Sequence, residues 1–140
     1  LVLRTAVREM PAEDRRLMER ILEVYRRTGY QSPRPDELPA LLKAPQAAID
    51  RLVELLCAEK RLVRLSRLVI LSYESFKQAQ DAVVRTIRDR GVLNSGDFKA
   101  VLGTSRKYAI TLLDYLDARR VTVRVGNDRK LTRDYEKNLL

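Results

Sequence analysis

The chain has 140 residues and a formal net charge of +9, from 28 Lys or Arg and 19 Asp or Glu residues. This charge predicts an anionic partner, most often a nucleic acid and less often a membrane surface, with an inert basic surface as the alternative. The lack of His and the single Cys argue against most zinc sites, an intrachain disulfide and a His-based catalytic triad. No apolar run approaches the ~18 residues of a transmembrane helix, so no membrane segment is expected.

Helical periodicity dominates the first half of the chain. Residues 1–8 are expected to end a preceding domain or to form a linker. A helix is predicted from Pro11, a residue type that suits the first helical position, to Gly29. A short helix near 36–43 and a third helix that begins at Pro45 follow, the third with an apolar stripe on one face.

A β-hairpin is predicted after the third helix. Residues 61–65 and 68–72 are rich in Leu and β-branched side chains, and they flank the short turn Ser66-Arg67. The single cysteine, Cys57, lies near the end of the third helix, where it is expected to pack as a small apolar side chain rather than act as a nucleophile.

The second half of the chain repeats this order of elements. The predicted elements are a first helix with its apolar stripe at 76–87 and its end at Gly91, a short helix at 97–102, a third helix with its stripe at 109–116, and two strands at 121–125 and 129–131. Gly103 makes the turn before the third helix, which Thr104 or Ser105 caps. The two strands flank Gly126-Asn127-Asp128, a strong hairpin turn.

An internal repeat relates the two halves. When the sequence is shifted by sixty positions without gaps, identical apolar residues align: Leu42, Leu52, Leu56, Ala58 and Val63 meet Leu102, Leu112, Leu116, Ala118 and Val123. By contrast, Gln46-Ala47-Ala48 in the first copy becomes Arg106-Lys107-Tyr108 in the second. The repeat therefore predicts one fold that is used twice, with different surface chemistry.

Three helices and a hairpin, with a tight turn between the second and third helices, are typical of the winged helix, a helix-turn-helix core with a β-hairpin wing. The sequence therefore predicts a mainly α protein with small β-hairpins (α+β), made of two tandem winged-helix domains at 9–72 and 73–140. The first half carries 14 basic and 10 acidic residues spread over its length, which favours a spacer or docking role.

Positive charge gathers on the third helix and hairpin of the second half. Residues 104–133 contain eight basic and three acidic side chains, so their net charge equals the +5 of the whole stretch 73–140. A helix-turn-helix unit presents the start of its third helix beside its wing, where phosphates and an unstacked base are expected to bind. The candidate contact residues are Ser105, Arg106, Lys107, Tyr108, Arg124, Arg129 and Lys130.

No catalytic constellation is recognisable in the sequence. Adjacent acids such as Glu13-Asp14 stand at helix starts, where capping explains them, and the five glycines form no phosphate-cradling loop. We therefore expect no enzymatic activity, no catalytic residue and no metal site in this chain. For the basic face, the alternative is a solvated surface with Tyr108 packed against Leu112.

Two runs of the second half carry the most specific pattern, LGTSRKYAITLLDYLD at 102–117 and RVGNDR at 124–129. They resemble the last winged-helix domain of bacterial selenocysteine-specific elongation factors (SelB). Residues 1–95 agree with that family in architecture, that is, in their tandem winged helices. The resemblance implies that the chain is the carboxyl-terminal part of a translation factor that delivers selenocysteinyl-tRNA to the ribosome at recoded UGA codons.

The same resemblance implies the partners. The seven candidate residues would bind RNA, an mRNA stem-loop called the selenocysteine insertion element (SECIS). GTP and Mg²⁺ would bind in an absent amino-terminal part, a translational GTPase, and no cofactor is expected in this one. The ribosome and selenocysteinyl-tRNA would be partners of the full-length factor, a cytoplasmic protein expected to be a monomer.

Two other functions fit the same architecture. A winged-helix transcription regulator would read DNA through its third helix and would usually dimerise. A protein-docking module would use its winged helices to hold subunits together. The tail at 132–140 belongs to no recognised pattern.

Overall fold

The computed structural model describes residues 10–140, and the side chains of all of these except Ser95 and Lys99. The chain divides into two compact units, Leu1–Ser75 and Phe76–Leu140. The domain end or linker expected at 1–8 lies outside the described residues.

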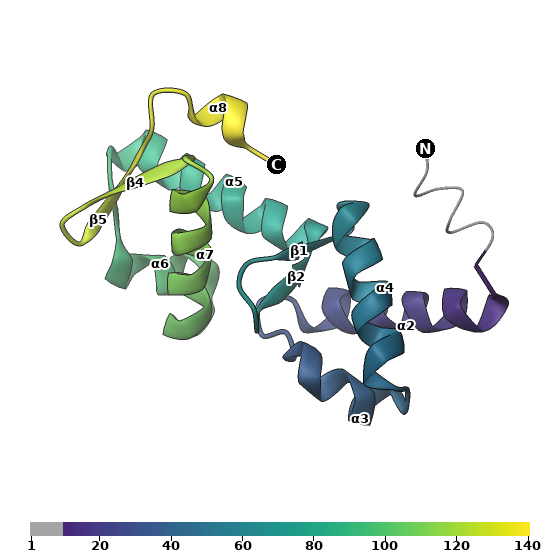
Figure 1. The fold of residues 1–140 in the computed structure, drawn as a ribbon. Coiled ribbons are helices and arrows are strands. Elements are labelled where there is room, and N and C mark those ends of the chain that lie inside the picture. Colours follow the sequence, from purple (N-terminus) through teal and green to yellow (C-terminus); the bar gives the residue numbers. More distant parts are fainter. Residues whose placement is uncertain (1–9) are drawn as a thin grey trace. The chain divides into compact units, whose positions relative to one another are not determined.

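The first unit has helices followed by a two-stranded antiparallel hairpin (Figure 1). Its described elements are α2 (Ala12–Thr28), the short 3-10 helix η1 (Pro35–Glu37), α3 (Leu38–Leu42), α4 (Gln46–Ala58), β1 (Leu62–Arg64) and β2 (Ile70–Ser72). α2 starts directly after Pro11 and ends at Gly29, and α4 starts directly after Pro45, as the sequence predicts.

Apolar stripes on α2 and α4 build the core of the first unit. Ile21 and Tyr25, one turn apart on α2, are fully buried, as are Ile49 and Leu56 on α4. Ile70 of β2 completes the same cluster. Burying an aliphatic or aromatic side chain of this size stabilises the folded state by ~1.5–3 kcal/mol, so these stripes hold the hairpin against the helices.

The second unit repeats this order and adds a third strand and a carboxyl-terminal turn of helix. The elements from residue 73 onward are α5 (Tyr73–Arg90), β3 (Leu93–Asn94), α6 (Ser95–Leu102), α7 (Arg106–Ala118), β4 (Thr122–Val125), β5 (Asp128–Leu131) and α8 (Tyr135–Asn138). Within the core of this unit, the Phe76 and Tyr115 rings meet edge to face, with centroids 5.4 Å apart and planes at 85°. The predicted winged-helix fold class, mainly α with small antiparallel sheets, is confirmed.

The sheet of the second unit has three strands in the order β3-β5-β4. Leu93 pairs with Arg129 and Asn94 with Asp128, so that the short β3 covers the outer edge of β5. The sequence did not predict this strand. In the first unit, Pro33 stands at the position equivalent to Leu93, and a proline has no N–H to donate to a strand ladder.

The sixty-residue repeat extends to the backbone conformation. Lys43 and Gly103, which align in the repeat, both have positive φ angles, of 53° and 63°. Lys60 and Arg120, which also align, both have φ of 63°. The turn before the third helix and the turn after it are therefore built in the same way in both units.

The tail folds back onto the second unit. The amide side chain of Gln80 is 1% exposed, donates to the Leu140 carbonyl at 3.4 Å and accepts from the Leu140 N–H at 3.1 Å. Arg119 Nη2 donates to the Asn138 carbonyl at 3.0 Å. These bonds to main-chain groups make residues 138–140 part of the fold of the unit.

Candidate nucleic-acid interface

The start of α7 presents two cations to solvent. Ser105 is the N-cap residue, and its carbonyl accepts the Ala109 N–H at 3.0 Å. Within the described part of the chain, the Ser105 side chain makes no capping hydrogen bond. Arg106 and Lys107 follow and are exposed. Because the first amides of a helix have no partner inside it, this end of α7 can accept an anion.

Lys107 and Tyr108 form a pair at the same helix end. Lys107 Nζ lies 5.6 Å from the centroid of the Tyr108 ring, which is half-buried. This distance is within the range of a cation–π interaction. The half-buried Tyr108 agrees with the alternative in which this residue packs against Leu112 in so far as its exposure is concerned.

The wing of the second unit is the antiparallel hairpin of β4 and β5. Its register pairs Arg124 with Arg129 and Val123 with Lys130. Directly opposed residues share a face of a hairpin, and neighbours along a strand alternate between faces. Arg124 therefore lies on the same face as Arg129, and Lys130 lies on the opposite face. Arg124 Nε donates to the Gly126 carbonyl at 2.9 Å, and the side chain remains exposed.

Arg129 does not belong to the exposed basic face, contrary to the expectation from the sequence. Its side chain is 4% exposed, and its Nε lies 3.0 Å from Asp117 Oδ2 on α7. Its Nη2 lies 3.5 Å from Asp114 Oδ1. A buried guanidinium needs such partners because of its desolvation cost. Arg129 therefore joins the wing to α7 and is not a candidate for direct contact with a ligand.

Sequence reasoning missed the acids that hold Arg129. Asp114 and Asp117 are three residues apart, which places them on one side of α7, and Thr122 of β4 also donates a hydrogen bond to Asp117 Oδ1. Two acids with this spacing in an otherwise basic stretch could have indicated an internal partner. Only the register of β4 and β5 shows which arginine it is.

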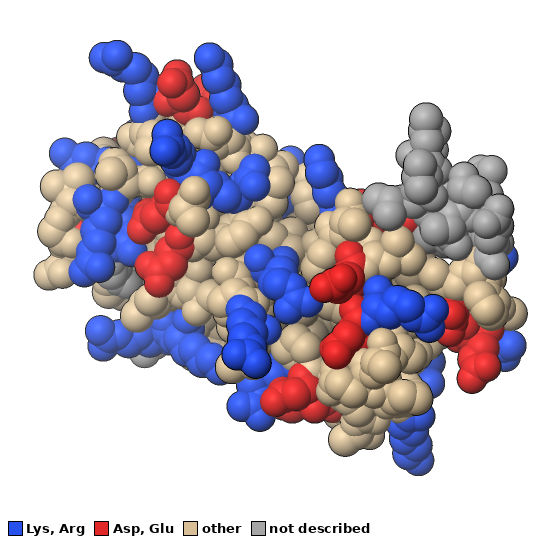
Figure 2. All heavy atoms as spheres, in the orientation of Figure 1, with Lys and Arg blue, Asp and Glu red and all other residues tan. Residues whose placement is uncertain are grey.

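Four of the predicted contact side chains are exposed cations without an ion pair among the described residues. They are Arg106, Lys107, Arg124 and Lys130. α7 contacts β4, and Figure 2 shows several Lys and Arg side chains over the β4–β5 hairpin, with a few acidic side chains beside them. Over the helices of the first unit, basic and acidic side chains alternate in the same view (Figure 2). The second unit therefore has an uncompensated basic surface around its third helix and wing.

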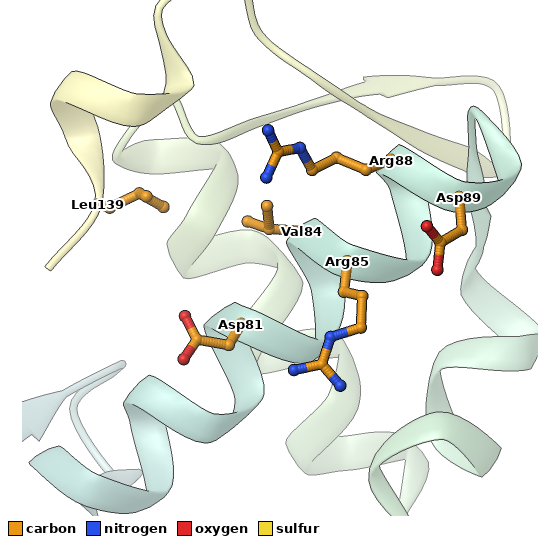
Figure 3. Close-up of a pocket in the computed structure, with 6 residues that line it drawn as sticks. All are labelled: Asp81, Val84, Arg85, Arg88, Asp89 and Leu139. Carbon is orange, nitrogen blue, oxygen red and sulfur yellow. The ribbon is translucent and has the colours of Figure 1, made fainter.

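A cavity on α5 has a different character. It has a volume of about 400 Å³ and is lined by Asp81, Val84, Arg85, Arg88, Asp89 and Leu139 (Figure 3). Two acids and two bases leave this cavity without an excess of charge. It therefore has no electrostatic preference for a polyanion and is not part of the candidate interface.

The remaining chemistry of the described residues offers no reactive centre. Cys57 is half-buried, and burial raises the pKa of its thiol, although nearby Arg64 lowers it. No group of three or more Cys, Asp or Glu side chains in the described part is arranged to hold a metal ion. In residues 10–140, no helix combines the length and apolarity needed to cross a bilayer.

Known proteins share this fold. Residues 85–131 match the family model for the winged helix of elongation factor SelB. The chain resembles the mRNA-binding domain of elongation factor SelB from E. coli, solved in complex with SECIS RNA, with a TM-score of 0.76 and 18% identity, covering 88% of this chain and 99% of that one. It also resembles a bacterial selenocysteine-specific elongation factor, EF-Sec, with a TM-score of 0.67 and 24% identity, covering 89% of this chain but 20% of that one. No curated protein matches the sequence.

Proposed function

We propose that this chain, whose second unit belongs to the SelB winged-helix family, binds an mRNA hairpin of the selenocysteine insertion element type. The family match over residues 85–131 confirms the resemblance seen in the sequence. The observation that carries the proposal is the exposed, unpaired cations at the start of α7 and on the wing. They stand on a fold shared with a domain that was solved with SECIS RNA.

In the proposed complex, the phosphate backbone supplies most of the affinity. The major groove of an A-form stem is too narrow for side chains to read, so the cations contact phosphates, and specificity comes from bases displaced in the loop or a bulge. The amides at the start of α7 are suited to one phosphate. The accessible part of the Tyr108 ring offers a surface on which a displaced base can stack. No catalytic role is assigned to any of these residues.

The whole factor to which this chain would belong is a further part of the proposal. The chain spans 20% of the selenocysteine-specific elongation factor that it resembles. We propose that the rest of the protein binds GTP, Mg²⁺ and selenocysteinyl-tRNA and brings them to the ribosome in the cytoplasm. This chain would then contribute the mRNA contact as a monomer without a cofactor.

A competition between two nucleic acids tests the proposal. A SECIS-type RNA hairpin and a DNA duplex of equal length are titrated against the chain at several salt concentrations. The hairpin is expected to bind more tightly, with a slope of log K against log salt that reflects ~0.7–0.9 per neutralised phosphate. Preference for the duplex, with a symmetric dimer in solution, would instead support a transcription regulator.

Single substitutions locate the contact. Arg106→Glu is expected to weaken hairpin binding roughly tenfold or more, and Arg90→Glu, an exposed residue at the end of α5, is the matched control. Arg124→Gln and Lys130→Gln compare the two faces of one wing, and we expect the larger loss from Arg124→Gln. Unchanged affinity in both Arg106→Glu and Arg124→Gln would exclude the basic face and favour a protein-docking role.

A further inference from the structure

The carboxyl-terminal tail forms one wall of another cavity in the second unit. This cavity has a volume of about 560 Å³ and is lined by residues from the end of α7, from β4 and from the segment 132–138. Its size lies within the about 300–1,000 Å³ that is typical of ligand-binding pockets. Thr132 Oγ1 and Asn138 Nδ2 both donate to the Arg120 carbonyl, the latter at 3.1 Å. The wall is therefore fixed to the turn that follows α7.

Three exposed cations line this tail cavity. They are Arg120, which follows α7, and Arg133 and Lys137 of the tail. None of the three forms an ion pair with another described residue. In Figure 2, Lys and Arg side chains project from the surface at which Figure 1 places α8, with acidic side chains between them. The cations of the tail cavity are therefore available to a ligand.

The two acids that line the tail cavity do not balance these cations. Asp117 Oδ2 accepts from Arg129 Nε at 3.0 Å, and Asp117 Oδ1 accepts from the Thr122 hydroxyl. The charge of Asp117 is thus compensated within the fold. Asp134 is exposed and is the other acid among the lining residues. Three cations therefore face one available carboxylate, and the cavity favours an anionic ligand.

β4 adds an open strand edge to the tail cavity. In the order β3-β5-β4, β4 is an outer strand and pairs with β5 alone among the described strands. The Thr132 N–H donates to the Val121 carbonyl at 3.1 Å, which sets the alternation of the ladder. The N–H and C=O groups of Val123 therefore point toward β5, and those of Thr122 and Arg124 point away from it. Val123 and Thr122 line the cavity, and the Val123 side chain, 45% exposed, gives it an apolar surface.

We propose that the tail cavity binds an extended acidic segment of a partner protein, which adds as a strand to the edge of β4. Such strand addition takes its affinity from main-chain hydrogen bonds and its specificity from contacts with alternate side chains. The phosphates of an RNA backbone only accept hydrogen bonds, whereas a peptide matches both the N–H and the C=O groups of the edge. Arg120, Arg133 and Lys137 attract the carboxylates of this segment, and an apolar residue of the segment packs on Val123.

A labelled model peptide tests this proposal on the full chain. The probe is a peptide with blocked ends in which Glu and Val alternate, and its binding is measured by fluorescence anisotropy at low ionic strength. One control peptide carries Lys in place of each Glu. A second control keeps the Glu residues but carries a methyl group on every amide nitrogen, so that it cannot donate to a strand edge. Both controls are expected to bind at least roughly tenfold more weakly than the probe.

Two double variants locate the site. Arg133→Gln with Lys137→Gln removes two cations of the tail cavity and is expected to weaken binding of the Glu–Val peptide roughly fivefold. Arg85→Gln with Arg88→Gln, both exposed on α5, removes the same charge from the same unit and is expected to leave this binding unchanged. If the two double variants bind the peptide equally, or if the methylated peptide binds as tightly as the probe, the proposal is overturned.

A short SECIS-type hairpin, titrated against the same variants, separates this result from that of the proposed function. The tail variant is expected to keep its hairpin binding within about twofold. Loss of hairpin binding with intact peptide binding would place Arg133 and Lys137 in the RNA interface and would overturn the proposal. Conversely, Arg106→Glu is expected to weaken hairpin binding and to leave peptide binding unchanged, so that either function can fail without the other.

Discussion

Arg129 Nε lies 3.0 Å from Asp117 Oδ2 and 3.3 Å from Asp117 Oδ1, which joins the buried face of β5 to the last turn of α7. The contact fixes the wing against the helix that starts with the exposed cations. It also explains why a basic residue in the middle of a basic stretch does not reach the surface.

Arg129→Gln is expected to lower the free energy of unfolding by about 1–3 kcal/mol, because Asp117 loses its charged partner. Denaturant unfolding of Arg129→Gln, Asp117→Asn and the double variant gives the coupling between the two residues. Because Arg129 positions the wing without touching RNA, the salt slope of hairpin binding is expected to stay unchanged even where affinity falls. A lower slope would show that Arg129 itself contacts phosphate.

Exchange of the two helix starts tests the difference between the units. Replacing Arg106-Lys107-Tyr108 with Gln-Ala-Ala reproduces the start of α4, which folds in the first unit with this sequence. We expect an unchanged fold, a salt slope lower by about 1.4 and at least tenfold weaker hairpin binding. The reciprocal change at Gln46-Ala47-Ala48 is the control for charge added elsewhere, and it should not restore binding of the short hairpin.

Lys43 and Gly103 stand at equivalent turns with left-handed backbone conformations. Replacing the lysine with glycine and the glycine with lysine is therefore expected to have opposite effects on stability. Lys43 has φ of 53° and Gly103 has φ of 63°, a conformation that costs a residue with a side chain roughly 1 kcal/mol. Lys43→Gly is therefore expected to raise the free energy of unfolding by up to about 1 kcal/mol, and Gly103→Lys to lower it by a similar amount. Urea unfolding measures both changes in the free energy of unfolding. Changes of the same sign would contradict the left-handed conformation assigned to these two residues.

The buried amide of Gln80 makes the tail part of the folded unit. Gln80→Leu is expected to cost about 1–3 kcal/mol of unfolding free energy, because the main-chain groups of Leu140 lose their partner. Truncation after Asp134 should cost a similar amount by leaving the Gln80 amide unpaired. In the truncated chain, Gln80→Leu should then be neutral or stabilising. If the losses of unfolding free energy from Gln80→Leu and from the truncation add up in the double variant, the two hydrogen bonds between Gln80 and Leu140 contribute little.

The thiol of Cys57 is expected to react slowly. Burial raises its pKa, and the charge of Arg64 opposes this effect. At pH 8 the thiol therefore holds less thiolate than a free cysteine, and alkylation by iodoacetamide should be slower than for a model peptide. Arg64→Gln should slow it further because it removes an interaction that lowers the pKa. A rate equal to that of the peptide would contradict this view.

Much of the fold could be predicted because local signals mark its boundaries. Pro11 and Pro45 directly precede helices, and Gly103 and Gly126 stand at the turns that the sequence predicts. The tip of the first hairpin was predicted at Ser66-Arg67, one residue before the observed loop. The turn could not be placed exactly because β1 and β2 have consecutive buried residues. Such strands show no alternation of apolar and polar side chains from which the register of the hairpin can be read.

The contacts that could not be predicted connect residues distant in the sequence. β3 has two residues, Leu93 and Asn94, and exists only because β5 pairs with it. For the candidate site, counting charges located the basic stretch, and Arg106 and Lys107 in it are exposed. A count cannot tell which face of a strand a residue occupies, and for Arg129 this face decides between contact and burial.

The pairing of Leu93 with Arg129 has a mechanical consequence. β5 has a neighbouring strand along each of its edges, so it resists bending in the plane of its sheet. A load applied to the wing therefore passes into α5 and α6 through the chain on either side of β3. In the hairpin of the first unit, β1 and β2 pair only with each other among the described residues, and Pro33 stands at the position equivalent to Leu93. The second hairpin should therefore transmit tension from a bound strand, while the first should yield to it.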